Sequence, residues 1–377
     1  MEKYPKFELN NRYSGMRKQS RTILNFENGI KSAYTRNMYR SRLNAFVEYF
    51  EMDIRLQSSF DELVKIPIKR LKEMVEDYVI FRKGKGLAFS TINNDICALS
   101  LFFVMNEIEV PLKRVRKWLP EVIKKRGGFP YTTELLQQGL KCLAGYSEYN
   151  AIVHVLCASG ARGGMSEHLK IKHIGELKEN CKSLLIYADT KDEYKTFIHD
   201  EAIEALNEWF QVRTQRGEIL TKDSWVFPHT RDTRLPLHES NIDSRLQTKL
   251  KSLDRGELIR GRYDIAITYG MRKRWKLVAM LTQGVNPHLV EKMFAHNSQT
   301  IQLDTVYLKP TEEQLFTEYK KFYSELYISQ EYRLKAELEK KDKIIIENQE
   351  EKDLRLESQE TRIAELEKII KDKFGFS

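Results

Sequence analysis

The stretch KKRGGFPYTT at residues 124–133 interrupts the chain most clearly, because it combines a basic run, two glycines and a proline. Glycine and proline break both helical and strand patterns, so regular structure is not expected to continue through it. We interpret it as a linker between two domains. The length agrees, because 377 residues are too many for one average domain and suffice for two domains with an appendage.

Before the linker, the sequence predicts a small helical domain. Residues 1–30 are polar and show no sustained period, which favours a flexible arm. Residues 31–123 carry three apolar stripes at helical spacing, so we expect three helices, with Thr35 capping the first and Ser90 the third. A glycine-containing loop that separates the second and third helices is a candidate DNA contact, because it holds the basic residues Arg82, Lys83 and Lys85.

After the linker, residues 134–326 are expected to form a mostly helical domain with one small sheet. Two short β-forming segments, Leu184–Ala188 and Thr196–His199, flank the turn DTKDEY and predict a hairpin. Asn286 and Pro287 make a good helix start, with asparagine as the cap and proline in the first turn. Helices are expected after residue 286 and over residues 134–143, 150–158, 201–210, 239–250 and 270–283.

The tail, residues 327–377, consists almost entirely of charged and polar residues with leucine and isoleucine. Six apolar residues fit the a and d positions of one heptad frame, but four polar residues share the same seam. The sequence predicts a long charged helix or a weak coiled coil and leaves self-association open. The apolar seam residues are Leu338, Ile345, Leu356, Ile363, Leu366 and Ile370, and the polar ones are Asp342, Gln349, Lys352 and Gln359.

The predicted fold is therefore mainly α, of the α+β class: a helical N-terminal domain, a mostly helical second domain with a small antiparallel β-sheet, and a C-terminal long or coiled-coil helix. A formal net charge of +9 favours a polyanionic partner. The tail has 11 basic and 13 acidic residues from Glu331 onward, so the positive charge belongs to the rest of the chain.

Cysteine usage and hydropathy indicate a soluble intracellular protein. The four cysteines form no C-x-x-C pair and are expected to be buried free thiols in a reducing compartment. The N-terminus lacks the apolar core of a signal peptide, and no apolar run reaches about 18 residues. We therefore expect no membrane partner and a cytoplasmic location.

Three side chains between residues 263 and 310 form the main candidate site. His296 follows Arg272 by 24 positions, and Tyr307 follows His296 by 11. A tyrosine hydroxyl can attack phosphorus and keep the bond energy in a phosphotyrosine ester, while a histidine can handle its proton. Arginine suits the phosphate, because its planar fork contacts two oxygens and stays charged.

Two upstream residues complete this candidate site. Arg162 follows Gly160, where a helix is expected to end, and the small residues around it let the backbone approach a phosphate closely. Lys191 lies at the tip of the predicted hairpin, from which a lysine can reach a DNA groove and protonate a leaving oxygen. Lys195, on the same hairpin, is the less favoured alternative.

Five motifs follow the helical domain in a fixed order: GAR at 160–162, the hairpin lysine, YGMR at 269–272, AH at 295–296 and VYLKP at 306–310. In content and order they resemble the tyrosine recombinase (phage integrase) family, over about residues 35–325. The YGMR box followed by a Tyr-x-x-Pro segment is most similar to integrases of archaeal viruses and plasmids.

The resemblance implies a site-specific recombinase that cuts and rejoins DNA through a 3′-phosphotyrosine intermediate and integrates or excises a mobile element. Tyr307 would be the nucleophile, with His296 assisting it and the phosphate. Arg162 and Arg272 would hold the scissile phosphate, and Lys191 would be the general acid. No cofactor is implied, and no metal site is expected because the histidines lack metal-ligand spacing.

The implied partner is double-stranded DNA at an attachment site, clamped between a core-binding first domain and the catalytic second domain. A homotetramer would hold two duplexes during recombination, in a cytoplasmic, nucleoid-associated setting in a prokaryotic or viral host cell. The expected DNA-binding residues are Arg82, Lys83, Lys85, Lys124, Lys125, Arg126, Lys273 and Arg274.

The chain departs from the family pattern at two accessory positions. Tyr269 stands where the family has the histidine of His-x-x-Arg, and a tyrosine can bond a phosphate oxygen but carries no positive charge. Glu167 follows Arg162 by five residues, whereas the family's acidic residue follows its arginine by three. One alternative is therefore a DNA-binding protein of the same fold that has lost cleavage. Another is an enzyme like a type IB topoisomerase, which uses the same chemistry on one duplex.

Overall fold

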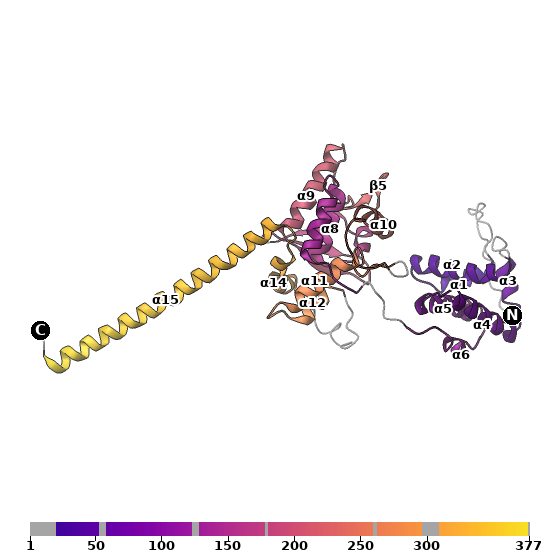
Figure 1. Ribbon diagram of the computed structural model, residues 1–377, viewed down its shortest axis with the longest axis horizontal. Coiled ribbons are helices and arrows are strands. Elements are labelled where there is room, and N and C mark those ends of the chain that lie inside the picture. Colours follow the sequence, from indigo (N-terminus) through magenta and orange to yellow (C-terminus); the bar gives the residue numbers. More distant parts are fainter. Residues whose placement is uncertain are drawn as a thin grey trace, which may run out of the picture. The chain divides into compact units, whose positions relative to one another are not determined.

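The structure is a computed structural model that describes residues 20–52, 58–122, 128–177, 180–258, 262–295 and 309–375. The chain divides into two compact units, residues 1–124 and 125–377, and the division falls at the start of the predicted linker (Figure 1). The fold is mainly helical, with small antiparallel sheets in the second unit and a long C-terminal helix, as the sequence predicts.

The first unit is a bundle of helices around an aromatic core. Phe46 and Tyr78 are fully buried and pack edge to face, with 5.2 Å between ring centroids. Phe26 and Phe102 make a similar contact at 5.7 Å, which joins the first helix to the fifth. The helices are α1 (Arg21–Asn28), α2 (Ala33–Tyr49), α3 (Ser58–Leu63), α4 (Ile68–Gly84), α5 (Phe89–Met105) and α6 (Lys113–Arg116).

Helix α1 corrects the prediction of a flexible arm over residues 1–30. Ser20 caps α1, because its side chain accepts a hydrogen bond from the Ile23 amide. Ile23 and Phe26 are completely buried in the core of the first unit. The sequence did not predict this helix, because α1 has only about two turns and its few apolar residues are separated by polar ones. Residues 1–19 lie outside the described part of the chain.

Two predicted helix caps are also wrong by a few residues. Helix α2 is capped by Ser32, whose side chain accepts a hydrogen bond from the amide of Thr35. Thr35 itself therefore lies inside the helix. Helix α5 begins after Ala88 without a side-chain cap, so Ser90 lies in its first turn. In both cases the helix begins before the predicted cap, as is common for boundaries read from single residues.

Helix α4 continues to Gly84, so Arg82 and Lys83 lie in its last turn and not in a loop. The Nε of Arg82 donates to the carboxylate of Asp95 at 2.9 Å, and Arg42 donates to the same carboxylate at 3.2 Å. Burial raises the pKa of Asp95, and the two arginines oppose that rise. This buried cluster links α2, α4 and α5, so Arg82 is mainly a structural residue.

The second unit contains a three-stranded antiparallel sheet in the order β1-β2-β3. The predicted hairpin is confirmed as β2 and β3, with Leu184 opposite Thr196. Strand β1 and the separate sheet of β4 and β5 were not predicted, because β1 and β4 have only three and two residues and show too little alternation. The strands are β1 (Ile174–Glu176), β2 (Lys182–Ile186), β3 (Tyr194–Ile198), β4 (Pro228–His229) and β5 (Asp232–Pro236).

The helices expected in the second unit are all present, and Asn286 caps the last of them with Pro287 in its first turn. They are α7 (Thr133–Cys142), α8 (Ser147–Ser159), α9 (Asp200–Gln215), α10 (Glu239–Lys249), α11 (Tyr269–Leu281) and α12 (Pro287–Met293). Further along the chain is α14 (Glu312–Lys320), and three short 3-10 turns are η1 (Gly163–Glu167), η2 (Ile171–His173) and η3 (Tyr323–Leu326).

Helix α8 lies in the centre of this unit, and side chains from other elements bind its final carbonyl groups. The last carbonyls of a helix have no partner within it. Trp275 and Tyr319 both donate to the carbonyl of Ala158 at 2.9 Å. Thr196 donates to the carbonyl of Ser159 at 2.7 Å. The end of α8 is thereby fixed to β3, α11 and α14, and Trp275 is a core residue.

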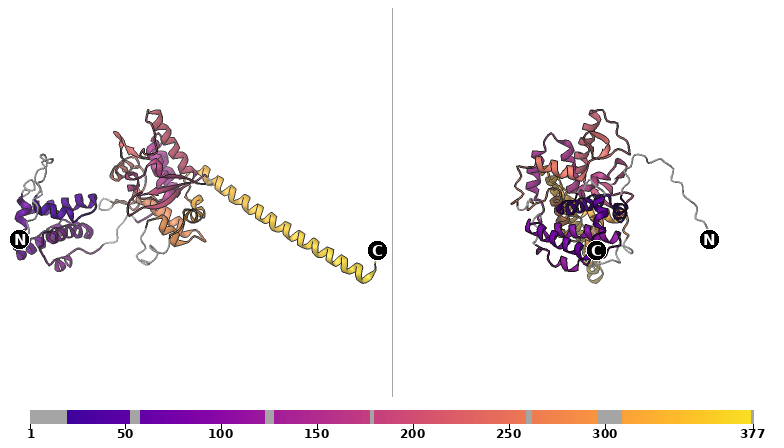
Figure 2. Two further views of the ribbon diagram at one scale, coloured as in Figure 1. Left: turned by 180° about the vertical axis from the view of Figure 1, so that it is seen from behind. Right: turned by 90° about the vertical axis from the view of Figure 1, so that its right-hand side faces the viewer.

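The tail forms one continuous helix, α15 (Gln330–Phe374) (Figure 2). Its beginning is attached to α9. Glu201 accepts hydrogen bonds from the backbone amides of Ile328 and Ser329, and Tyr332 donates to Glu204 at 2.7 Å. Of the helices in the described ranges, none is both long enough and apolar enough to span a membrane.

None of the four cysteines, all in the described ranges, forms a disulfide, as the sequence predicts. Cys157 and Cys181 are buried, whereas Cys97 and Cys142 are only half-buried. Burial raises the pKa of the Cys157 thiol to about 12, so this thiol is protonated and unreactive near neutral pH.

The turn after α8 makes a prediction about stability. Gly160 has φ = 64°, and a Cβ there would lie 2.6 Å from Trp275. We expect Gly160→Ala to lower the free energy of unfolding by about 3 kcal/mol or more. The cost of a left-handed backbone conformation and the cost of a clash with the core would both contribute to this loss. Gly217, with φ = 87° and open space around it, is the matched control, and Gly217→Ala should cost only about 1 kcal/mol. Equal losses in urea unfolding would contradict the packing argument.

Candidate active site

Arg162 lies in the turn that follows α8. Gly160 ends the helix in the left-handed conformation, and Arg162 is extended, with φ = −77° and ψ = 152°. Gly163 and Gly164 then begin η1. The guanidinium group of Arg162 donates from Nη2 to the carbonyl of Ala295 at 3.2 Å. This contact joins the turn to the residue just before His296 in the chain.

Arg272 lies in the first turns of α11 and is only 1 % exposed. Its Nη1 donates to the carbonyl of Gly160, and its Nη2 donates to the carbonyl of Phe294. The guanidinium carbon also lies 3.4 Å from the centre of the Phe294 ring. The two predicted phosphate-binding arginines therefore reach the carbonyls of two consecutive residues at the end of α12.

The electrostatics of the pair favour an anion. Burial lowers the pKa of Arg272 to about 10, and the nearby positive charge of Arg162 acts in the same direction, while Tyr194 opposes it. Arg272 stays charged at neutral pH. Its Nε is buried, and so is the hydroxyl of Tyr194, whose side chain lies beside Arg272. A negatively charged ligand would offset the repulsion between the cations and offer acceptors to these groups.

Three side chains beside the arginines were missed by the sequence reasoning. Burial raises the pKa of Tyr187 to about 12, and Arg162 and Arg272 both lie near enough to oppose that rise. Tyr194 is buried beside the same arginines. The carboxylate of Glu239 packs against the backbone of Gly163 and Gly164, where a Cβ would come within 3.0 to 3.1 Å of it. These residues belong to no motif in the sequence. The one sequence signal was the glycine pair Gly163 and Gly164, which indicates that another group packs closely against this turn.

The hairpin places its two lysines differently. Lys191 is exposed in the turn between β2 and β3, and the described residues give its side chain no hydrogen bond or ion pair. Lys195, on β3, forms an ion pair with Glu312 at the start of α14. Of the two lysines, Lys191 is thus the one whose ammonium group is not held by an ion pair within the described residues.

The two accessory residues have different surroundings. Tyr269 is the first residue of α11, is 50 % exposed and lies one turn before Arg272. The Lys273 ammonium lies 5.0 Å from the centre of its ring. Glu167 accepts a hydrogen bond from the backbone amide of Glu239 at 2.9 Å, at the start of α10. Its carboxylate therefore binds the helix that carries Glu239, and Glu239 is the acidic residue that touches the Arg162 turn.

His296 and Tyr307 lie outside the described residues. The chain is described up to Ala295, which is bound by Arg162, and again from Lys309. The basic residues Lys124, Lys125 and Arg126 also lie outside the described ranges.

Arg274 has a different role from the predicted DNA contact. It is 4 % exposed, and its Nη1 donates to the carbonyl of Leu326 at 2.9 Å. Its Nη2 donates to the carbonyl of Glu325 and the hydroxyl of Thr133, both at 3.1 Å. The two-residue step from Arg272 turns Arg274 to another face of α11, where it binds the segment before α15. The prediction is wrong because the sequence shows a basic cluster but not which members are buried.

The remaining predicted DNA contacts are on the surface. Lys83 and Lys85 are exposed at the end of α4, and Lys85 lies 5.3 Å from the centre of the Phe81 ring. Lys273 is half-buried, and burial lowers its pKa. A DNA-binding role for these three lysines remains a prediction.

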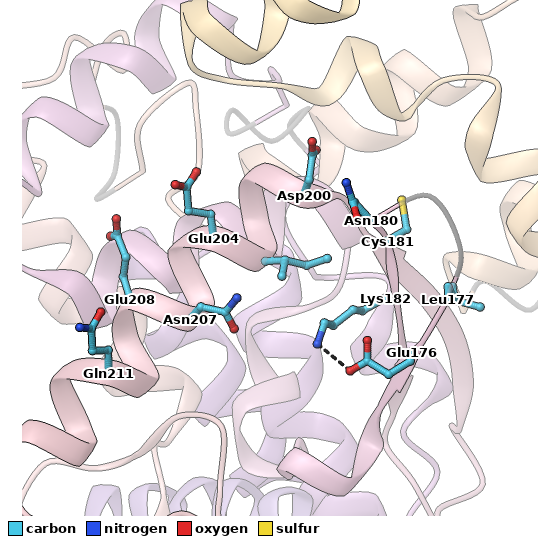
Figure 3. Close-up of a pocket in the computed structure, with 11 residues that line it drawn as sticks. Glu176, Leu177, Asn180, Cys181, Lys182, Asp200, Glu204, Asn207, Glu208 and Gln211 are labelled. Carbon is cyan, nitrogen blue, oxygen red and sulfur yellow. Dashed lines mark hydrogen bonds and ion pairs between the residues drawn. The ribbon is translucent and has the colours of Figure 1, made fainter.

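A pocket of about 530 Å³ lies between β1, β2 and α9, and its lining has the wrong charge for DNA (Figure 3). Asp200, Glu204 and Glu208 come from α9, and Glu176 comes from β1. Lys182 donates to Glu176 at 2.7 Å, so the one lysine of the lining is already paired. Carboxylates repel a phosphate backbone, so the candidate DNA site is the surface near Arg162 and Arg272.

The histidines offer no metal site in the described part of the chain, where no group of three or more metal-ligating residues was found. His154 and His199 are buried, and burial lowers the pKa of both, so they are neutral core residues.

Comparisons with known proteins identify the fold. No protein-family model and no curated protein matches the sequence. Among solved structures, the Tn1549 transposon integrase in complex with circular intermediate DNA is similar with a TM-score of 0.52 and 18% identity, over 79% of this chain and 98% of that chain. The same integrase with transposon right end DNA gives a TM-score of 0.52 and 17% identity, over 80% and 98%. XerA recombinase is 17% identical over 80% and 97%, with a TM-score of 0.37.

The chain therefore has the tyrosine recombinase fold, and the resemblance seen in the sequence is confirmed at the level of the fold.

The contacts of Arg274 make a second prediction. We expect Arg274→Gln to lower the free energy of unfolding by about 2–4 kcal/mol, because it leaves buried carbonyl groups without a donor. The matched control is its neighbour, and Lys273→Gln should cost about 1 kcal/mol or less. Urea unfolding of the full chain measures both. Equal stability of the two variants would mean that Arg274 is not a structural residue.

Proposed function

We propose that the protein is a site-specific DNA recombinase that cuts and rejoins DNA through a 3′-phosphotyrosine intermediate and integrates or excises a mobile element. The observation that carries the proposal is the convergence of Arg162 and Arg272, from separate parts of the chain, on the carbonyls of Ala295 and Phe294. Two adjacent cations held in this way form a site for a single phosphate.

In the proposed reaction the hydroxyl oxygen of Tyr307 attacks the scissile phosphorus. A bond forms between this oxygen and phosphorus, and the bond from phosphorus to the 5′ oxygen of the next nucleotide breaks. His296 assists removal of the tyrosine proton, and Lys191 donates a proton to the departing 5′ oxygen. The two arginines stabilise the charge that develops on the non-bridging oxygens. Attack by a 5′ hydroxyl on the phosphotyrosine reverses these steps and rejoins the strand.

The proposed partner is double-stranded DNA at an attachment site, with both units of the chain contributing. The Tn1549 integrase, which shares the fold, is described in complex with DNA. Positive charge outside the tail supports the same partner here. Lys83, Lys85 and Lys273 would contact the phosphate backbone, and affinity should fall steeply with salt because these contacts release counterions. Recombination of two duplexes would use a homotetramer, in a nucleoid-associated setting in the cytoplasm.

A covalent trapping experiment tests the central proposal. A nicked attachment-site duplex that loses a short 5′ product on cleavage should leave wild-type protein covalently bound to DNA. Tyr307→Phe should abolish the adduct and retain DNA binding, because only the nucleophile is removed. Tyr146, an exposed tyrosine, is the matched control, and Tyr146→Phe should form as much adduct as wild type.

The outcomes separate the alternatives. DNA binding by the wild type without any adduct would identify a DNA-binding protein that has lost cleavage, which the neutral Tyr269 would explain. An adduct accompanied by relaxation of supercoils without a preferred sequence would identify an activity of the type IB topoisomerase kind. An adduct that survives Tyr307→Phe would assign the nucleophile elsewhere.

The hairpin lysines make a further prediction. Lys191→Ala should slow cleavage by about 10²- to 10⁴-fold, the usual contribution of a general acid. A substrate with sulfur in place of the bridging 5′ oxygen should restore the rate, because a thiolate leaves without a proton. Lys195→Ala breaks the ion pair with Glu312, and any loss it causes should not be rescued by the sulfur substrate. Rescue of Lys195→Ala and not of Lys191→Ala would exchange the two roles.

A further inference from the structure

The C-terminal part of α15 presents an apolar stripe that the described residues of the chain do not cover. Leu356, Ile363 and Leu366 are 56%, 56% and 52% exposed. Their spacings of seven and three residues place them at successive a, a and d positions, on one face of the helix. In the same frame the upstream seam positions mix the apolar Leu338 and Ile345 with the polar Asp342, Gln349 and Lys352. Apolar residues therefore predominate in the seam only from Leu356 onward, in the second half of the helix.

Charged residues flank this stripe in a regular order. Arg355 and Arg362 occupy the g positions, each just before an a residue, and Glu360 and Glu367 occupy the e positions. In a parallel pair of helices, each g residue faces the e residue five positions later on the other helix. Arg355 would therefore face Glu360 of the second helix.

The second pair follows the same rule, because Arg362 would face Glu367 of the second helix. Both pairs have opposite charge and occur twice in a symmetric dimer. An antiparallel pair would instead place g opposite g and e opposite e, so that arginine faces arginine and glutamate faces glutamate. The charge pattern thus fits a second copy of this chain, side by side in the same direction, and disfavours the reverse arrangement.

We propose that residues 355–367 of α15 form a parallel two-stranded coiled coil with the same residues of a second copy of the chain. Gln359 occupies the d position between Leu356 and Ile363, so the contact is short and reversible and not a tight zipper. Residues 330–352 of α15 then remain single helices that connect the coiled coil to the anchor on α9. This contact would join two copies without using the candidate active site.

Cysteine trapping tests the register and the direction on the full-length protein. In the proposed arrangement the two copies of position 363 face each other, so Ile363→Cys should form a disulfide-linked dimer rapidly under mild oxidation. Thr361, on the outer face at an f position, is the matched control, and Thr361→Cys should cross-link no faster than wild type. Equal trapping of the two variants would overturn the proposal, because an antiparallel or disordered contact would not favour position 363.

Charge reversal tests whether the partner of this helix is a second copy of the chain. Glu360→Arg combined with Glu367→Arg should weaken self-association of the full chain by about ten-fold or more in sedimentation equilibrium, because four pairs of facing arginines then line the contact. Adding Arg355→Glu and Arg362→Glu reverses the charges within each pair, so that each pair again has opposite charges. This variant should restore the wild-type affinity. Unchanged association in the first variant, failure of the exchange to restore it, or a wild-type trimer would overturn a parallel two-stranded pairing. None of these readouts requires DNA cleavage, so they stand apart from the test of the recombinase proposal.

Discussion

The carbonyl groups of residues 158–160, at the end of α8, are the constraint on which the candidate site depends. A helix end buried in a core must find donors for its last carbonyls. Here β3, α11 and α14 supply them as side chains, and Arg272 supplies the donor for Gly160. The same bonds that satisfy the helix therefore fix the turn that carries Arg162.

This arrangement brings the positive charges of Arg162 and Arg272 close together. Arg272 is almost completely buried, and burial lowers its pKa while leaving it charged at neutral pH. The backbone carbonyls of Gly160 and Phe294 hold its guanidinium group, and the ring of Phe294 lies against it. Carbonyl dipoles hold a cation without neutralising it, so the site keeps a positive potential.

Neighbouring basic residues differ here in the partners that they bind and not in residue type. Arg272 and Arg274 lie two positions apart on α11, yet one binds the turn beside the candidate site and the other binds the segment before α15. Lys191 and Lys195 lie on one hairpin, and within the described ranges only Lys195 forms an ion pair, with Glu312. Arg82, predicted to contact DNA, is bound to the buried Asp95. Sequence motifs identify such clusters but cannot divide them into structural and functional members.

The sequence by itself determined the mainly helical fold class, the helices of the second unit and the hairpin, because apolar periodicity and turn residues are local signals. It also selected Arg162 and Arg272, through motifs in a fixed order. Only the tertiary structure decided that these arginines meet at consecutive carbonyls, that Glu239 touches the Arg162 turn, and that α1 belongs to the core. Those facts depend on contacts between residues far apart in the chain, for which no local pattern carries information.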